Sequence, residues 1–345
     1  MPCPDAIGQS LRTVAERFTG PLTAIRPFGT GHINDTFLVA TAAGEYVVQR
    51  INTAVFHDPD AVTANILAVY RHVRGAMVPE PVPTADRSGN WLVHDADGGV
   101  WRAWHRAPGE PRAAEDAGPA ELRSAAALLG RFHALAADLT PDGLTETLPR
   151  FHDPARRLED LRAVVAADPC GRVATARDEI AAAEAAEPLA GLATDLMNRV
   201  PTRVAHFDAK LDNILFSGDD AVCLVDLDTV MPGAWFWDVG DLLRSGATAA
   251  AEDDRDLDRA VVQAERYEAI VGGYREALGA PVAGPPTAAE FEAIDAAGAI
   301  VTYEQAVRFL TDWIAGDVYY RIERPEQNLD RARAQFRLLA SMPGA

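Results

Sequence analysis

The sequence is poor in several residue types, and each scarcity excludes a class of protein. Only three cysteines occur in 345 residues, and Cys3, Cys170 and Cys223 are too scattered for a metal-binding motif and too few for a disulfide framework. No apolar run is long enough to span a bilayer, and residues 1–18 alternate charged with apolar residues instead of forming an export signal. We therefore expect a cytoplasmic protein without a membrane span.

Basic residues are also scarce. The chain has 32 Lys and Arg against 51 Asp and Glu, which gives a formal net charge of −19. A long polyphosphate such as DNA or RNA would be repelled, so we expect no nucleic-acid partner, whereas a small nucleotide can be held by local amides, cations and a metal ion. Every basic position except Lys210 is arginine, which draws attention to the segment around that lysine.

The first hundred residues have the pattern of a small antiparallel sheet. Asp58 followed by Pro59 is typical of a helix start, with the aspartate as N-cap, and one helix is expected there. Short strands joined by turn-forming residues are expected on both sides of this helix, at residues 22–27, 35–40, 45–51, 82–84, 91–94 and 100–105.

Beyond a connection rich in Pro, Gly and charge at residues 107–119, the composition becomes alanine-rich with helical periodicity. Helices are expected at residues 122–139, 155–167, 175–186, 189–199, 255–278, 288–315 and 331–340. Two brief apolar strands are expected among them, at residues 214–216 and 222–225. The sequence thus predicts an α+β chain with a sheet lobe over residues 1–106 and a larger, mainly helical lobe over residues 107–345.

Polar residues interrupt the two brief strands, between residues 204 and 228, in a pattern that favours phosphoryl transfer. This reaction needs an oriented hydroxyl, a metal ion bridging the phosphates and positive charge around the transferring group. Asp208 would orient the hydroxyl, Asn213 and Asp226 would offer oxygen ligands to Mg²⁺, and Lys210 would place its charge near the γ-phosphate of ATP. The plainer interpretation is a buried polar turn. We expect a structural role for His206 in either case.

A glycine-bearing hairpin near the N-terminus could serve the nucleotide. In it, the backbone of Gly29, Thr30 and Gly31 could approach phosphate, although such a hairpin is more often only a turn. No lysine precedes Lys210, so Arg50 or its neighbour Gln49 would have to replace a lysine on the third strand. Arg50 could instead be an exposed strand residue that pairs with surface carboxylates.

The spacing His-x-Asp-x4-Asn, followed by an apolar strand and an aspartate, resembles the protein-kinase-like superfamily, which implies a two-lobe kinase-like fold. Within it the chain resembles the aminoglycoside phosphotransferase-type kinases and, more narrowly, the N-acetylhexosamine 1-kinases. The narrower resemblance covers most of the chain. It is carried by residues 28–37 (FGTGHINDTF), 46–52 (YVVQRIN), 129–133 (LGRFH), 226–233 (DLDTVMPG), 303–313 (YEQAVRFLTDW) and 316–320 (GDVYY).

This resemblance implies transfer of the γ-phosphate of ATP, with Mg²⁺, to the anomeric hydroxyl of an N-acetylhexosamine. It also implies sugar contacts from Asp208 and from four further residues, His32, Asp228, Tyr303 and Arg308. Plainer interpretations stay open for three of these: Asp228 could support the metal ion, Tyr303 could be a core residue, and Arg308 could pair with Glu304 one helical turn away. Asp238 and Asp241 are expected to cap amides at a helix start and to brace the catalytic loop.

Two other functions remain possible on the sequence. The acceptor could be another sugar, an aminoglycoside or an amino alcohol, since acidic clusters such as residues 252–254 could serve a cationic substrate. The missing strand lysine could also mark a catalytically silent nucleotide-binding protein, although Asp208, Asn213 and Asp226 are all present. In each case we expect a monomer that binds small molecules.

Overall fold

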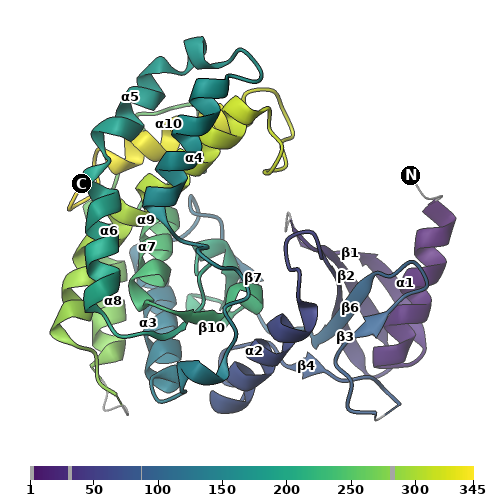
Figure 1. The fold of residues 1–345 in the computed structure, drawn as a ribbon. Coiled ribbons are helices and arrows are strands. Elements are labelled where there is room, and N and C mark those ends of the chain that lie inside the picture. The colour runs from purple at the N-terminus through teal and green to yellow at the C-terminus, as the bar shows by residue number, and fades with distance from the viewer. Residues whose placement is uncertain (1–3, 30–32, 87, 280–283) are drawn as a thin grey trace.

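The computed structural model describes residues 4–29, 33–86, 88–279 and 284–345, and it places them in two lobes (Figure 1). The first lobe, here called the sheet lobe, holds a six-stranded antiparallel sheet in the order β1-β2-β3-β6-β4, with β5 also paired to β6. Its elements are α1 (Pro4–Thr19), β1 (Leu22–Pro27), β2 (Asp35–Thr41), β3 (Gly44–Ile51), α2 (Pro59–His72), β4 (Pro81–Val82), β5 (Val93–His94) and β6 (Val100–His105).

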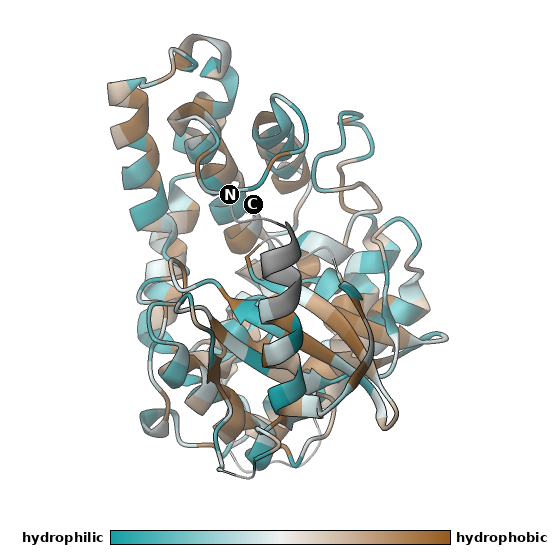
Figure 2. Ribbon diagram, turned by 90° about the vertical axis from the view of Figure 1, so that its right-hand side faces the viewer, coloured by the Kyte–Doolittle hydropathy of each residue, from teal (hydrophilic) through white to brown (hydrophobic). Residues whose placement is uncertain are grey.

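The sheet lobe has a small core of its own. Leu11, Val14 and Phe18 of α1 are buried against the sheet, where they join Val48 of β3 and Trp101 of β6 in one apolar cluster. Figure 2 shows α1 lying in front of largely hydrophobic strands. The alternation of side chains along β3 and β6 therefore sends one face toward α1 and leaves the other face for the second lobe.

Helix α2 begins where its N-cap predicts and joins the sheet lobe to the rest of the molecule. The side chain of Asp58 accepts a hydrogen bond from the N–H of Ala61 at 2.9 Å. Val62, Ile66 and Val69 are buried in the same apolar cluster as the helices of the second lobe. Because this core is shared, the division of the chain expected at residue 106 stays a prediction.

The second lobe, the helical lobe, is arranged around one long helix. Its helices are α3 (Pro119–Ala136), α4 (Pro154–Ala167), α5 (Arg177–Ala185), α6 (Pro188–Arg199), α7 (Trp235–Gly246), α8 (Ala264–Leu278), α9 (Ala288–Ala315) and α10 (Gln327–Leu339). Helix α9 packs against α4, α6, α7 and α10. Its contact with α7 is close at Gly240, where a Cβ would come within 2.5 Å of the carbonyl oxygen of Ala297. None of the described helices has both the length and the apolar character of a transmembrane span.

Helix α8 begins nine residues later than the helical periodicity predicts, at Ala264 instead of Arg255. The reason lies in the aspartates that precede it. The N–H of Asp256 donates to the side chain of Asp254 at 2.9 Å, and the N–H of Asp258 donates to the side chain of Asp256 at 3.3 Å. Such local hydrogen bonds compete with helix formation, and periodicity alone does not reveal them.

Short strands frame the polar segment within the helical lobe. They are β7 (Glu110–Pro111), β8 (Arg203–Ala205), β9 (Ile214–Ser217), β10 (Asp220–Leu224) and β11 (Met231–Gly233). They form two small sheets, β10-β9-β7 and β11-β8. Strands β8, β9 and β10 hold the two ends of the polar segment at fixed positions, so the residues between them can only occupy a tight loop.

Candidate active site

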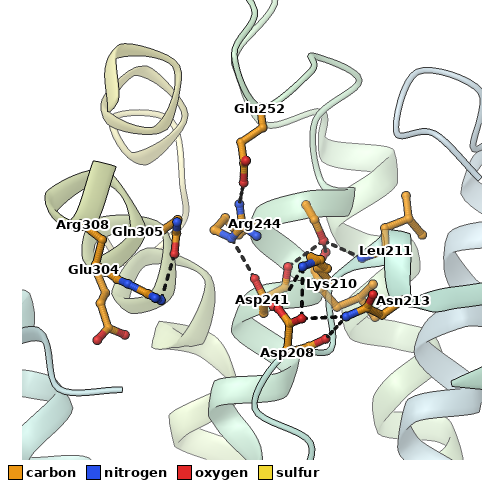
Figure 3. A network of polar contacts seen from close by, with 12 residues as sticks. Asp208, Lys210, Leu211, Asn213, Asp241, Arg244, Glu252, Glu304, Gln305 and Arg308 are labelled. Carbon is orange, nitrogen blue, oxygen red and sulfur yellow. Dashed lines mark hydrogen bonds and ion pairs between the residues drawn. The ribbon is translucent and has the colours of Figure 1, made fainter. Parts of the chain in front are cut away.

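The polar loop between β8 and β9, here called the catalytic loop (residues 206–213), brings three predicted residues together (Figure 3). Lys210 Nζ lies 3.2 and 3.1 Å from the two carboxylate oxygens of Asp208. Asn213 Nδ2 donates to Asp208 Oδ2 and to the Asp208 carbonyl oxygen, both at 2.8 Å. The carboxylate of Asp208 is therefore held from two directions while about a quarter of its side chain, 27%, stays exposed.

Of the two α7 aspartates, Asp238 braces the loop with its carboxylate, as expected, whereas the carboxylate of Asp241 pairs with Arg244. The buried carboxylate of Asp238 accepts the backbone N–H of His206 at 2.7 Å and that of Phe207 at 2.6 Å. Asp241 acts indirectly: its carbonyl oxygen accepts from Ser245 Oγ, which in turn accepts the N–H of Leu211. These contacts fix the backbone from which Asp208 projects.

His206 and Phe207 complete the backbone geometry of the loop. The buried ring of His206 contacts the carbonyl oxygen of Val225 through Nε2 at 2.9 Å, which fits the structural role expected of it. Phe207 has a left-handed backbone with φ 67°. This conformation is unfavourable for a bulky residue, so it needs support from its surroundings.

Asp208 and Lys210 shift each other's pKa. Burial raises the pKa of Asp208, but the charge of Lys210 and the hydrogen bonds outweigh this and hold the pKa below its usual value of 3.8. Burial lowers the pKa of Lys210, but neighbouring carboxylates, Asp208 foremost, raise it above the ordinary value. At neutral pH the pair is a carboxylate beside an ammonium group.

Asn213 and Asp226 fit a magnesium site. Because Asn213 turns its amide nitrogen to Asp208, its Oδ1 is left for a cation, and the N–H of Val225 ties the next strand to the Asn213 carbonyl at 2.8 Å. The side chain of Asp226 is partly open to solvent. Loss of hydration around its carboxyl group, together with the charges of Asp228 and Asp208, raises the pKa of this group to about 7. A bound cation would relieve this repulsion.

No three His, Cys, Asp or Glu side chains gather into a metal centre within the described ranges.

Asp228 lies near Asp226, whose pKa its charge raises, but its carboxylate is already engaged by other residues. Its carboxylate is only 2% exposed and forms an ion pair with Arg102 of β6. Its other oxygen accepts a hydrogen bond from Asn34 Nδ2 at 2.6 Å. The side chain expected to contact the sugar is instead consumed by a contact between the lobes.

Gln49 and Arg50, the two candidates to replace the strand lysine, point to opposite faces of the sheet. Arg50 is exposed and lies against Gly99. Gln49 Oε1 accepts from Arg102 Nε at 3.1 Å, from Arg102 Nη2 at 2.9 Å and from Trp104 Nε1 at 2.9 Å. The cation that faces the helical lobe is thus Arg102, held by Gln49 on one side and Asp228 on the other.

Only part of the glycine hairpin can be placed. Gly29 has φ 76°, a left-handed conformation that favours glycine. Thr30, Gly31 and His32 lie outside the described residues. Contacts from this hairpin to phosphate or sugar stay predictions.

The two α9 residues expected to contact the sugar, Arg308 and Tyr303, lie in different surroundings. Arg308 is half-buried, donates to Gln305 Oε1 at 3.2 Å, and lies close enough to Asp208 to interact with its charge. Its guanidinium covers the rings of Phe151 and Tyr320, with 5.4 and 5.7 Å to the ring centroids. Figure 3 shows Gln305 and Arg308 entering the site region from the α9 side.

Tyr303 lies in the core. It is fully buried, and this burial, followed by the charges of Glu184 and Glu187, raises the pKa of its hydroxyl. The structure therefore favours the plainer interpretation of Tyr303 as a core residue.

Two residues at the site carried weak sequence signals. Arg102 is a charged residue in an otherwise apolar strand, and a buried charge of that kind usually needs a partner. His152 precedes the Asp153 N-cap of α4, and nothing in its local pattern shows that it contacts the catalytic loop.

Comparisons with known proteins identify the family and the fold of the chain. Residues 24–280 match the sequence model of the phosphotransferase enzyme family. The chain is similar to an aminoglycoside phosphotransferase from Alicyclobacillus acidocaldarius, with 16% identity, a TM-score of 0.61, and coverage of 99% of this chain and 96% of that chain. A microcompartment-associated aminopropanol kinase gives 16% identity, a TM-score of 0.62 and coverage of 96% and 95%.

The GDP complex of aminoglycoside 2′-phosphotransferase-IIIa gives 11% identity, a TM-score of 0.64 and coverage of 96% and 98%. At such identities the similarity shows the fold alone. It confirms the predicted α+β, two-lobe kinase-like architecture.

Proposed function

Because this chain belongs to the phosphotransferase enzyme family, we propose that it transfers the γ-phosphate of ATP to the anomeric hydroxyl of an N-acetylhexosamine. The observation that carries the proposal is the catalytic loop: a partly exposed Asp208 carboxylate, ionised at neutral pH, beside Lys210 and Asn213. Phosphoryl transfer depends mainly on positioning and on charge, and this loop provides both.

In this mechanism Asp208 accepts a hydrogen bond from the acceptor hydroxyl and turns its oxygen toward the phosphate. Lys210 keeps the carboxylate ionised and places a positive charge beside the transferring group. Asn213 and Asp226 would hold Mg²⁺, and the bound ion would supply positive charge that offsets the charge of the phosphates. Asp238 fixes the loop backbone, so little reorganisation is needed when the substrates bind.

The acceptor preference is supported by Arg308. A guanidinium that interacts with Asp208 would repel a cationic amine at the same place, whereas it can donate hydrogen bonds to the hydroxyls or the amide oxygen of a neutral sugar. The motifs that resemble those of N-acetylhexosamine 1-kinases support an N-acetylhexosamine as the acceptor within this class. The similar aminopropanol kinase and aminoglycoside phosphotransferases make amino alcohols and aminoglycosides the alternatives to test.

For the nucleotide, we propose that Arg102 supplies the positive charge that a lysine on the third strand would otherwise provide. Gln49 takes the place expected for the lysine but is uncharged, and it holds Arg102 instead. Arg102 Nη1 is buried and has no hydrogen-bond partner among the described residues, so one donor remains for phosphate. A pocket lined by Arg106, Gly109 and Phe216, at the connection between the lobes, would receive the base.

The Asp208 carboxylate, the cations and the proposed metal ligands all come from one chain, so a monomer would be sufficient. The scarcity of cysteine supports a cytoplasmic location.

The test is an incubation of the protein with ATP, Mg²⁺ and separate hexoses, N-acetylhexosamines, amino alcohols and aminoglycosides. Phosphorus and proton NMR then locate any new phosphate, with Asp208→Asn as the control. Phosphate on the anomeric carbon of an N-acetylhexosamine is expected. Transfer to a different acceptor would keep the phosphotransferase activity and remove the sugar assignment.

A further inference from the structure

His152 contacts the catalytic loop at the carbonyl of Phe207, the residue whose N–H is held by Asp238. The ring is only 6% exposed and stacks between Trp237 and Phe207, at centroid distances of 4.8 and 5.7 Å and interplanar angles of 13° and 14°. Its Nε2 lies 3.1 Å from the carbonyl oxygen of Phe207, the residue before Asp208. Its Nδ1 lies 2.6 Å from Oε2 of Glu304 on α9.

Both partners of His152 can only accept hydrogen bonds. A carbonyl oxygen has no proton to donate, and an ionised carboxylate has none either. To satisfy both contacts, both ring nitrogens must carry a proton, and the ring is then a positively charged imidazolium.

Another buried histidine near the loop, His133, shows the contrast. Its Nε2 lies 2.8 Å from Asp238, and its Nδ1 lies 2.7 Å from the hydroxyl of Tyr274. A hydroxyl can donate as well as accept, so a neutral His133 with one proton satisfies both contacts. Burial lowers the pKa of His133, in agreement with the neutral form.

Glu304 is built to hold the charge of His152. It is only 1% exposed, its Oε1 accepts the N–H of Asp153 at 2.7 Å, and Arg157 Nε approaches the same oxygen at 3.8 Å. Burial raises the pKa of Glu304, but the charges of His152 and Arg308 and the hydrogen bonds outweigh it, so the pKa lies below its usual value. Apart from the ring, the N–H of Asp153 and the charges of Arg157 and Arg308 also favour the ionised form of this carboxylate.

We propose that His152, held as an imidazolium by Glu304, is a positioning residue that fixes the left-handed peptide at Phe207 and thereby aims the carboxylate of Asp208. The N–H of Phe207 is held by Asp238 and its carbonyl by His152, so both ends of this unfavourable residue are tied to the helical lobe. Glu304 lies on the same helix as Arg308, so the pair also fixes the acceptor side relative to Asp208. The inference rests on the proposed role of Asp208.

The charge state is tested without any turnover. In protein labelled with ¹⁵N-histidine, two protonated ring nitrogens are expected for His152 at neutral pH and one for His133. The His152 signals are assigned by their loss in His152→Phe. A singly protonated His152 in the folded protein would overturn the proposal.

The positioning role is tested with His152→Phe, which keeps a stacked ring and removes both N–H groups. With ATP and N-acetylglucosamine we expect kcat to fall roughly 10- to 100-fold, because small misplacements of a reacting group are costly, while the KM for ATP changes less than about twofold. Hydrogen exchange in a peptide spanning residues 204–210 should become faster. Unchanged kcat and unchanged exchange in the folded variant would refute the positioning role.

Two further variants keep the test decisive. His152→Phe/Glu304→Gln removes the uncompensated charge if the single variant fails to fold, and the same loss of kcat is expected. Glu292→Gln, on the same helix but exposed and paired with Arg199, is the matched control and should change nothing.

If the wild-type protein phosphorylates no N-acetylhexosamine, the proposed function is refuted, but the role of His152 is not. The NMR and exchange measurements still decide the role of His152, and the rate comparison is then made on ATP hydrolysis with water as acceptor.

Discussion

In the helical lobe the cation of the site, Lys210, comes two residues after the aspartate with which it pairs, whereas in the sheet lobe the cation comes from a different strand than the one on which it was expected. Arg50 is on the strand where the cation was expected, but its side chain is exposed at the surface. Arg102, on the neighbouring strand, reaches Asp228 of the helical lobe.

The two sides also differ in how their cations are held. Lys210 is about one-third exposed and belongs to a loop that is braced by hydrogen bonds from α7. Arg102 is only 4% exposed and belongs to an ion pair between lobes. Phosphate chemistry requires a cation at a place in space, and a sheet can supply it from an adjacent strand because side chains directly opposite each other lie about 5 Å apart.

The largest effect is expected at the aspartate of the helical side. Asp208→Asn should lower kcat by about 10³-fold, because an amide does not provide the anionic acceptor that orients the hydroxyl. Nucleotide affinity and thermal stability should be close to those of the wild type. The measurement is a steady-state assay with the acceptor found by NMR, and full activity in this variant would exclude Asp208 from the mechanism.

On the sheet side, Arg102→Met should weaken ADP binding in the presence of Mg²⁺ by about tenfold to a hundredfold, the range for loss of one charge-assisted hydrogen bond. It should also destabilise the fold by about 3 kcal/mol, since Asp228 keeps a buried charge without its partner. Calorimetric titration and denaturant unfolding measure the two effects.

Arg102→Met/Asp228→Asn separates these two effects. Removing both charges should return most of the stability, and the amide oxygen can still accept from Asn34. Nucleotide affinity should stay low. If the double variant binds ADP as the wild type does, Arg102 has only a structural role.

The stability of the helical lobe should depend on pH through the carboxyl group of Glu304. Its pKa is lower in the folded protein than its usual 4.5, so it stabilises the fold above that value, and this contribution is lost as the pH falls through the folded-state pKa. At pH 7, Glu304→Gln should cost about 3 kcal/mol of unfolding free energy. Urea unfolding at several pH values should show the difference from wild type shrinking at acid pH; a constant difference would contradict it.

The smallest effect is expected at Arg50. Arg50→Ala should change ADP affinity and kcat by less than about twofold, because the side chain is exposed and faces away from the helical lobe. The assays used for Arg102 serve as the measurement. A tenfold loss of affinity would restore Arg50 as the replacement for the lysine.

Local sequence patterns determined much of the fold because their causes are local. The Asp58 N-cap and Pro59 start α2, and helix α9 has the bounds that its periodicity predicts. The polar residues of the catalytic loop could be predicted because polar groups within a buried strand are costly unless they form hydrogen bonds or serve a function. The delayed start of α8 was missed because aspartate side chains bind the preceding backbone.

That Asp208, Lys210 and Asn213 share one loop could be predicted from the amino-acid order, since these residues are close along the chain and interrupt a buried strand. Tertiary structure alone decided which side chains from other segments complete the site. Arg102 meets Asp228 across 126 positions and His152 meets Phe207 across 55, and neither distance along the chain carries any local signal. Such pairs form because a buried charge or a strained peptide must be satisfied by whatever the fold brings within reach.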